Sequence, residues 1–132
     1  DENGYKNAGY IVGNKTEEGY RYGYIDINGK MLLELEYNEI QRITDVKEND
    51  IYLIAAKNGQ YGLFKNKEQV IGNEYQSITY NQTDETLILQ KTKKFGIANL
   101  DGKIIIPVEY KQIDSIGMYI PKKEQKYKLI VI

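Results

Sequence analysis

Residues 95–110 read FGIANLDGKIIIPVEY, and this stretch decides the fold. Its opening pair, Phe95-Gly96, begins an apolar segment. Asp101-Gly102 is a strong hairpin signal, because both residue types tolerate the positive φ angles of a two-residue type I′ turn. The apolar run 104–106 follows and stops at a proline, which lacks the N–H group that a continued strand ladder needs. These signals together predict a β-hairpin.

The same pattern occurs twice more, as YGYIDINGKMLLELEY at 22–37 and YGLFKNKEQVIGNEY at 61–75. The leading aromatic residues of the three stretches lie 39 and 34 residues apart. A Glu-Tyr pair closes each stretch, and its tyrosine lies 15, 14 and 15 residues after the aromatic residue. The first copy carries Asn28-Gly29 as its turn, whereas the second has no Asn-Gly or Asp-Gly pair there and is the most degraded. An internal repeat is therefore the main feature of the chain.

Each repeat continues beyond its hairpin with an isoleucine three residues after the Glu-Tyr pair and then a second apolar strand. The sequence predicts one repeat domain, 1–132, in which residues 10–21 end a preceding unit and 22–60, 61–94 and 95–132 form three units of about four strands. No segment shows a helical apolar period. The predicted fold is all-β: tandem β-hairpin repeats forming an elongated, twisted antiparallel array of about thirteen strands. Three units fall short of the four to eight blades of a closed propeller.

Composition excludes several classes of function. The chain has 132 residues with no His and no Cys, which removes zinc sites, thiol nucleophiles and Ser-His triads, so we expect no enzyme, no metal and no cofactor. Eighteen basic residues stand against nineteen acidic ones, and a net charge of −1 argues against nucleic-acid binding. No apolar run approaches the length of a membrane span. The acidic loop 45–50 lacks the spacing of a calcium site.

The three stretches resemble the WG-repeat (KWG-repeat) family of bacterial proteins. The family pattern is an aromatic-Gly strand, an Asn/Asp-Gly-Lys turn, an apolar strand ending in Ile-Pro and then a Tyr, and residues 95–110 match it best. The resemblance covers about residues 10–132, with Tyr or Phe standing where the family has Trp. It implies a repeat module that mediates recognition, and it carries over no catalytic residue.

Nine residues recur at fixed positions in the units, and we expect them to form the repeat core, with the rings packed between units. These residues are Tyr22, Gly23, Tyr37, Tyr61, Gly62, Tyr75, Phe95, Gly96 and Tyr110. A row of aromatic platforms for a sugar or a peptide is the alternative interpretation of the rings. The glycine after each leading ring lies inside a strand, where it allows a backbone or a flat ring to approach closely.

Other tyrosines, among them Tyr5 and Tyr10, fall outside the repeat phase. Repetition does not explain them, so Tyr52, Tyr80 and Tyr119 are predicted as a possible contact surface, because tyrosine combines apolar area with a hydroxyl group. The leading hypothesis is a non-enzymatic module for protein or peptide recognition. The alternative is a carbohydrate or cell-envelope binding module of an exported or surface protein, which the absence of Trp disfavours.

The apolar segment 127–132 would form an edge strand, and such strands invite pairing with another chain. The edge would pair with another copy, be followed by more chain, or be covered by the leading strand near Tyr10. We expect self-association through this strand or a chain that continues in a longer protein. A start at Asp1 rather than Met also points to a piece of something longer. The absence of cysteine fits both an exported and a cytosolic protein, and an exported or cell-surface location is slightly favoured.

Overall fold

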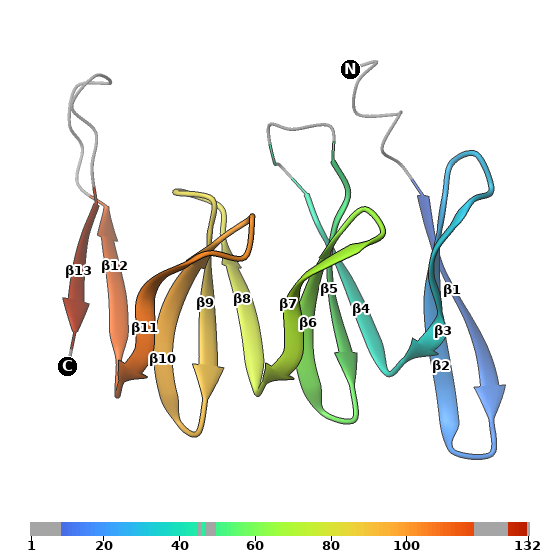
Figure 1. The fold of residues 1–132 in the computed structure, drawn as a ribbon, viewed down its shortest axis with the longest axis horizontal. Coiled ribbons are helices and arrows are strands. Elements are labelled where there is room, and N and C mark those ends of the chain that lie inside the picture. The colour runs from blue at the N-terminus through green and yellow to red at the C-terminus, as the bar shows by residue number, and fades with distance from the viewer. Residues whose placement is uncertain (1–8, 45, 47–49, 118–126, 132) are drawn as a thin grey trace.

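The regular structure of the chain is entirely β. The computed structural model describes residues 9–44, 46, 50–117 and 127–131, and Figure 1 shows their strands side by side in chain order. The strands are β1 Gly9–Thr16, β2 Gly19–Asp26, β3 Met31–Tyr37, β4 Glu39–Ile43, β5 Tyr52–Lys57, β6 Gln60–Lys65, β7 Glu68–Tyr75, β8 Ser77–Asn81, β9 Thr86–Lys91, β10 Lys94–Asn99, β11 Ile104–Tyr110, β12 Ile113–Gly117 and β13 Tyr127–Val131. The predicted all-β repeat array is confirmed. The described residues hold no helix that could cross a membrane.

The strands form four antiparallel sheets, which stand in a row along the long axis of the molecule (Figure 1). The first sheet has the order β1-β2-β3, the second β4-β5-β6-β7, the third β8-β9-β10-β11 and the fourth β12-β13. Every neighbour in a sheet is also a neighbour in sequence, so all pairings are local hairpins or meanders. The array is therefore built from successive four-strand sheets, of which the first and the last hold fewer strands among the described residues.

The sheets are offset by half a repeat from the units of the sequence. The unit 22–60 supplies β2 and β3 to the first sheet and β4 and β5 to the second, and the unit 61–94 bridges the second and third sheets in the same way. The chain changes sheet directly after the Glu-Tyr pair, where Asn38 alone separates β3 from β4. At that crossing the Asn38 N–H donates to the Ala56 carbonyl oxygen at 2.8 Å. Each unit thus links two neighbouring sheets covalently.

Turn residues locate the hairpins, but two of the predicted turn types need correction. Asn58 and Gly59 have φ angles of 55° and 77°, as a type I′ turn requires. At Asn28-Gly29 only the glycine is left-handed, with φ of 86°, so the predicted two-residue turn is wrong. Its cause is Asp26, whose carboxylate accepts two backbone N–H groups of the turn at 2.9 and 2.8 Å and so closes a longer loop. In the third unit, Asn99 accepts the corresponding pair at 3.0 and 2.9 Å. There, too, only the glycine has a positive φ, of 87°, so the type I′ turn predicted at Asp101-Gly102 is also wrong.

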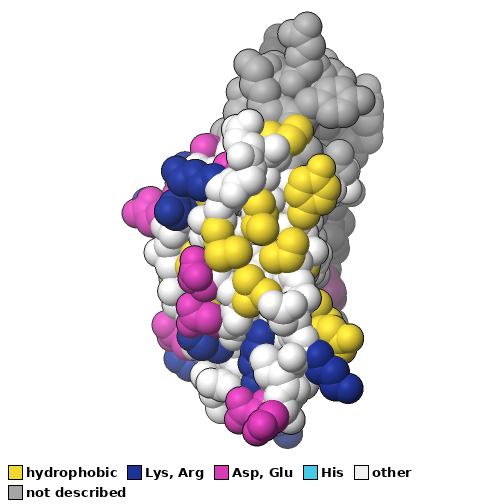
Figure 2. Space-filling view, turned by 90° about the vertical axis from the view of Figure 1, so that its right-hand side faces the viewer, with side chains coloured by type: hydrophobic (Ala, Val, Ile, Leu, Met, Phe, Trp, Pro, Cys, Tyr) yellow, Lys and Arg dark blue, Asp and Glu magenta, His cyan; other side chains and the backbone are white. Residues whose placement is uncertain are grey.

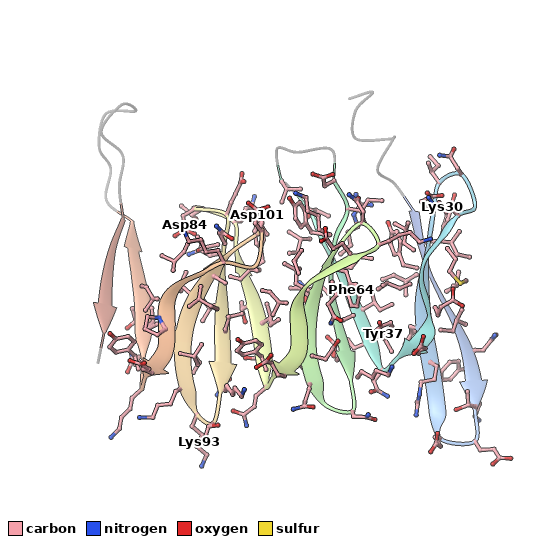
Figure 3. The ribbon with its side chains drawn as sticks, in the orientation of Figure 1. Lys30, Tyr37, Phe64, Asp84, Lys93 and Asp101 are labelled. Carbon is pink, nitrogen blue, oxygen red and sulfur yellow. The ribbon has the colours of Figure 1, made fainter. Side chains whose placement is uncertain are left out.

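The hydrophobic core lies between the sheets, in two clusters. The cluster between the first and second sheets holds Tyr24, Leu33, Tyr37, Ile40, Ile51, Leu53, Ala55 and Phe64. The cluster between the second and third sheets holds Ile43, Tyr52, Ile54, Leu63, Ile71, Ile78, Leu87, Leu89, Ala98 and Leu100. In Figure 3, Tyr37 and Phe64 point toward each other across the first of these gaps, and their rings meet edge to face with centroids 5.7 Å apart. Since apolar area is buried only by stacking, each sheet depends on its neighbours.

The glycine that follows each leading aromatic residue marks the closest approach of two strands. A Cβ built on Gly96 would come within 2.5 Å of the Ile106 carbonyl oxygen and 2.7 Å of the Val108 nitrogen, both in the partner strand β11. The ladder between β10 and β11 shifts register at this point, which is typical of a β-bulge. β11 continues through Pro107 to Tyr110, so the predicted end of the strand at this proline is wrong, because the bulge accommodates the proline. The predicted close approach of another backbone therefore occurs here. Gly23 and Gly62 meet β3 and β7 in the same way.

Candidate binding surfaces

The repeated rings stand as cross-strand pairs rather than as separate platforms. The leading aromatic residue lies opposite the tyrosine of the Glu-Tyr pair in all three units: Tyr22 opposite Tyr37, Tyr61 opposite Tyr75 and Phe95 opposite Tyr110. Tyr37 is buried, and the other five rings are half-buried. Tyr22, Tyr61 and Tyr75 also pack against the two core clusters. The bulge accounts for the spacing of about fifteen residues between the paired rings.

At two successive sheet junctions, a lysine of the following sheet contacts both residues of the Glu-Tyr pair. The Lys57 ammonium donates to the Glu36 carboxylate at 2.8 Å and lies 5.7 Å from the centre of the Tyr37 ring. At the next junction, Lys91 repeats these contacts with Glu74 at 2.9 Å and with the Tyr75 ring at 5.8 Å. Hydrogen bonds to these carboxylates raise the pKa of both lysines. The Glu-Tyr pair therefore links sheets, a role that spacing alone did not show.

A second polar contact links β4 to β6 of the same sheet. The Tyr61 hydroxyl donates to the Glu39 carboxylate at 2.8 Å. This hydrogen bond, and then burial, raises the pKa of Tyr61 above its ordinary value. Burial followed by the neighbouring Glu36 carboxylate also raises the pKa of Tyr37. The carboxylates of Glu36 and Glu39, which raise the pKa of neighbouring tyrosines, therefore take part in contacts that stabilise the array.

The tyrosines predicted as a contact surface differ in burial. The prediction is wrong for Tyr52, which is 2% exposed and packs in the core between the second and third sheets. Its place in the run 52–56, which is apolar throughout, is typical of a strand buried on both faces and could have revealed this. Tyr80 is half-buried and packs against the same core. Tyr119 lies outside the described residues.

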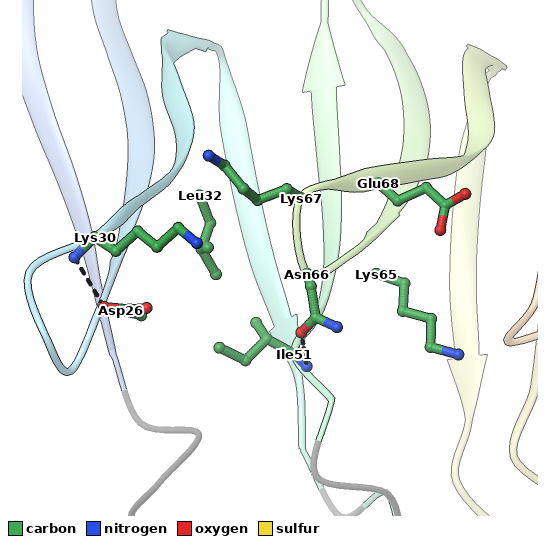
Figure 4. A pocket seen from close by; sticks show the side chains of 8 residues that line it. All are labelled: Asp26, Lys30, Leu32, Ile51, Lys65, Asn66, Lys67 and Glu68. Atoms are coloured by element: carbon green, nitrogen blue, oxygen red, sulfur yellow. Dashed lines mark hydrogen bonds between the residues drawn. The ribbon is translucent and has the colours of Figure 1, made fainter.

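A polar cleft of ≈ 510 Å³ lies between the β2–β3 and β6–β7 turns (Figure 4). Charges of both signs line it, with Lys30 and Lys67 near Asp26 and Glu68. Two of its oxygen acceptors already hold the backbone: Asp26 closes its own turn, and Asn66 accepts the Ile51 N–H at 3.0 Å. Within the described part of the chain, no group of acidic residues is arranged to hold a metal ion. We therefore interpret the cleft as the junction of two turns.

The outer face of the first sheet, formed by Tyr10, Val12, Ile25 and Met31, departs from this closed packing. Ile11 pairs with the buried Tyr24 and faces the second sheet, so alternation places Tyr10 and Val12 on the opposite, outward side. Ile25 lies beside Tyr10, and Met31 beside Ile25. Figure 2 looks onto this end of the array and shows hydrophobic side chains gathered at its centre, with charged ones around them.

The strand register shows which faces of the second and third sheets are equivalent to this outer face, and those faces are buried. Val12, Ala55 and Leu89 each lie opposite the repeat glycine, so Tyr10 corresponds to Leu53 and Leu87, two residues earlier. Both leucines are 0% exposed, because they pack on the preceding sheet. Tyr10 is 63% exposed. Because the first sheet has no sheet before it among the described residues, the same side of the β-sheet is left open to solvent there.

The edge of the first sheet also lacks a neighbouring strand among the described residues. β5 and β9 each pair with two strands, whereas β1, which holds the same place in its sheet, pairs only with β2 among the described residues. Beside this edge lies a pocket of ≈ 260 Å³ lined by Ile11, Tyr22 and the start of β4. Ile11 itself is 47% exposed. Asn38 and Glu39 also line this pocket, so its wall is mixed in polarity.

Comparison with known proteins agrees with this architecture. The family model described as WG containing repeat matches residues 22–61 and 95–127, together more than half of the chain. The matched stretches are the first and third units, and the degraded second unit lies between them. Searches of curated proteins and of solved structures gave no significant match. The chain belongs to the WG-containing repeat family.

Proposed function

We propose that this chain is a non-enzymatic repeat module that recognises a protein or peptide through the outer face of its first sheet. One observation carries the proposal: Tyr10 is 63% exposed, whereas Leu53 and Leu87, at the same place in the next two sheets, are 0% exposed. An exposed apolar surface rimmed by polar residues is a common mark of a protein-binding site. Tyrosine is also a favoured anchor at such interfaces.

The absence of catalytic chemistry supports the non-enzymatic part of this proposal. The chain has no His and no Cys. The contacts of its described acidic side chains are largely structural: Asp26 closes a turn, Glu39 accepts from Tyr61, and Glu36 and Glu74 bind lysines of the next sheet. These groups already have partners, so they hold the array together rather than await a substrate.

A carbohydrate ligand is the second candidate, and two exposed rings favour it. Tyr20 is 53% exposed and stacks on Tyr22 with ring centroids 6.0 Å apart. Such a flat, exposed pair could receive a sugar ring. The outer face instead combines Tyr10 with aliphatic side chains, which suit a protein surface better than a sugar.

Parallel binding screens test the two candidates. Wild-type chain, a Tyr10→Lys variant and an Ile105→Lys control would be applied to a protein array and to a glycan array. Ile105 is a suitable control because it is also apolar and 52% exposed, but it lies on β11 of the third sheet. Circular dichroism would first establish that each variant is folded.

The proposal expects protein ligands whose affinity falls about thirtyfold in Tyr10→Lys, which is the loss of about 2 kcal/mol expected at an interface anchor, and stays unchanged in the control. Protein binding that is equal in both variants would contradict the outer face as the site. Binding to glycans alone, with dependence on Tyr20, would favour the second candidate instead.

A further inference from the structure

The β6–β7 turn of the second unit is one residue shorter than the β10–β11 turn of the third. Asn99 and Lys103 enclose three residues, whereas the equivalent pair, Lys65 and Glu68, encloses two. Lys65 also stands where Asn99 and Asp26 accept two backbone N–H groups of their turns, and an ammonium group cannot accept a hydrogen bond. The longer turn therefore lacks its stabilising contacts in the second unit.

The β10–β11 turn fills the space between its own sheet and the preceding one. A Cβ built on Gly102 would clash with the Val70 carbonyl group of β7, so this turn lies directly on the second sheet. The neighbouring Asp101 carboxylate accepts a hydrogen bond from the Lys65 ammonium group at 3.4 Å. An aspartate-glycine pair thus closes the junction between the second and third sheets, through contact with a strand and through a charge pair.

The shorter β6–β7 turn leaves the corresponding space open between the first and second sheets. Leu32 of β3 holds the register position of Val70, and it lines the cleft of ≈ 510 Å³. The turn is held away from this space by its own sheet: the Asn66 N–H donates to the Ile51 carbonyl oxygen at 2.7 Å, and the Asn66 side chain accepts the Ile51 N–H at 3.0 Å. The cleft is therefore an interior feature of the array, with fixed walls on both sides.

Two lysines that make no ion pair among the described residues extend into this cleft. Lys30 comes from the β2–β3 turn and Lys67 from the β6–β7 turn, and Figure 4 shows their side chains reaching in from opposite sides. Lys65, the third lysine of the lining, already has two aspartate partners. The Asp26 carboxylate is occupied by its own turn, and Glu68 extends away from both free lysines in Figure 4. The cleft thus offers two positive charges to a ligand.

From this geometry we infer that the cleft binds an acidic turn of a partner protein, in which an aspartate-glycine pair takes the place that Asp101-Gly102 occupies at the next junction. The aspartate carboxylate would accept charge-assisted hydrogen bonds from the Lys30 and Lys67 ammonium groups. The glycine would allow the bound backbone to lie on Leu32. The cleft shares no residue with the outer face of the first sheet, so this inference goes beyond the proposed function and does not rest on it.

The turn of the third unit provides the probe. The peptide has the sequence of residues 98–104, ANLDGKI, with Ala98→Cys and Ile104→Cys joined by a disulfide, because these two residues are paired across the hairpin. The ring keeps the loop closed, which lowers the entropy cost of binding. The protein has no cysteine, so the disulfide stays within the peptide.

Binding of this cyclic peptide to the full chain would be followed by calorimetry and by amide chemical shifts. We expect saturable binding, with the largest shift changes at Lys30, Leu32 and Lys67. A peptide with Asp101→Asn should bind at least about tenfold more weakly, because the hydrogen bonds then lose the charge of their acceptor.

Variants of the protein locate the site. Lys30→Gln combined with Lys67→Gln should weaken binding at least about tenfold, because both charged donors are lost. Lys103→Gln is the matched control and should bind as the wild type does, since Lys103 is exposed and holds the position of Lys30 in the third sheet. Tyr10→Lys should also leave peptide binding unchanged. Circular dichroism would first establish that each variant is folded.

Several results would overturn the inference: no binding at about 1 mM peptide, equal affinity for the wild type and the double lysine variant, or shift changes centred on Val70, which would show exchange with the native β10–β11 turn. Displacement of the peptide by an equal concentration of inorganic phosphate would also overturn it, because the cleft would then hold any anion. If peptide binding requires Tyr10, the peptide occupies the outer face and the inference falls. If the peptide binds as expected while no protein ligand depends on Tyr10, the cleft stands as a site and the proposed recognition through the outer face falls.

Discussion

Gly96→Ala tests whether the repeat glycine exists for steric reasons. A Cβ at this position would lie 2.5 Å from the Ile106 carbonyl oxygen, 2.7 Å from the Val108 nitrogen and 2.8 Å from the Pro107 carbonyl carbon. All three are backbone atoms of β11, so the clash cannot be relieved by turning a side chain. Either β10 and β11 separate locally or the bulge rearranges, and overpacking of this kind costs about 2–3 kcal/mol.

The matched control is Gly72→Ala. There the nearest atom to an added Cβ is the Glu74 carboxylate oxygen at 3.4 Å, at the end of a flexible side chain. This variant should be neutral or gain about 0.5 kcal/mol, because alanine restricts the unfolded chain. At roughly 4 °C per kcal/mol for a domain of this size, Gly96→Ala should lower Tm by about 8–12 °C. Thermal unfolding followed by circular dichroism measures both variants, and equal melting temperatures would refute the steric explanation of the motif.

Three other perturbations follow from the core, the polar contacts and the turns. Leu53→Ala removes a 0% exposed side chain from between the first two sheets and should cost about 2–5 kcal/mol in urea unfolding. The raised pKa of Tyr61 means that the fold holds its proton more tightly than the unfolded chain does. Its contribution is therefore present below about pH 10 and lost as the pH rises further, and Tyr61→Phe should reduce the loss of stability measured between pH 9 and about 11. Thr92 and Lys93 have φ angles of 53° and 62°, so replacing them by Asn-Gly should raise the unfolding free energy by about 1–2 kcal/mol.

Local chemistry made most of the fold predictable from sequence. Repeated spacing located the units, and the pairs Asn28-Gly29 and Asp101-Gly102 marked the positions of two hairpins, although not their turn type. The half-repeat offset was harder to find, because a sequence repeat shows only that a pattern recurs and not which strands share a sheet. The crossing at Asn38 is set by packing between sheets, and packing leaves no short-range signal.

The candidate surface was less predictable than the fold. Tyr52 and Tyr10 both fall outside the repeat phase, yet one is 2% exposed and the other 63%. The difference arises because Tyr52 faces a neighbouring sheet, whereas Tyr10 occupies a position for which the described residues supply no neighbour. Whether a residue is exposed depends on whether another sheet packs against it, and a short stretch of sequence does not show this. The self-association predicted for the segment 127–132 stays a prediction.

The half-repeat offset also bears on how such a chain could lengthen or shorten. Removing residues 22–60 in frame would join Arg21, near the start of β2, to Tyr61 in β6. The hybrid strand would follow β1 as β6 follows β5 in the second sheet. Duplicating the same segment would insert one complete junction between sheets. Recombination at the aromatic-Gly boundary can therefore change the number of units while every interior sheet keeps four strands. The length of the array is thus free to vary while each interior junction between sheets keeps its form.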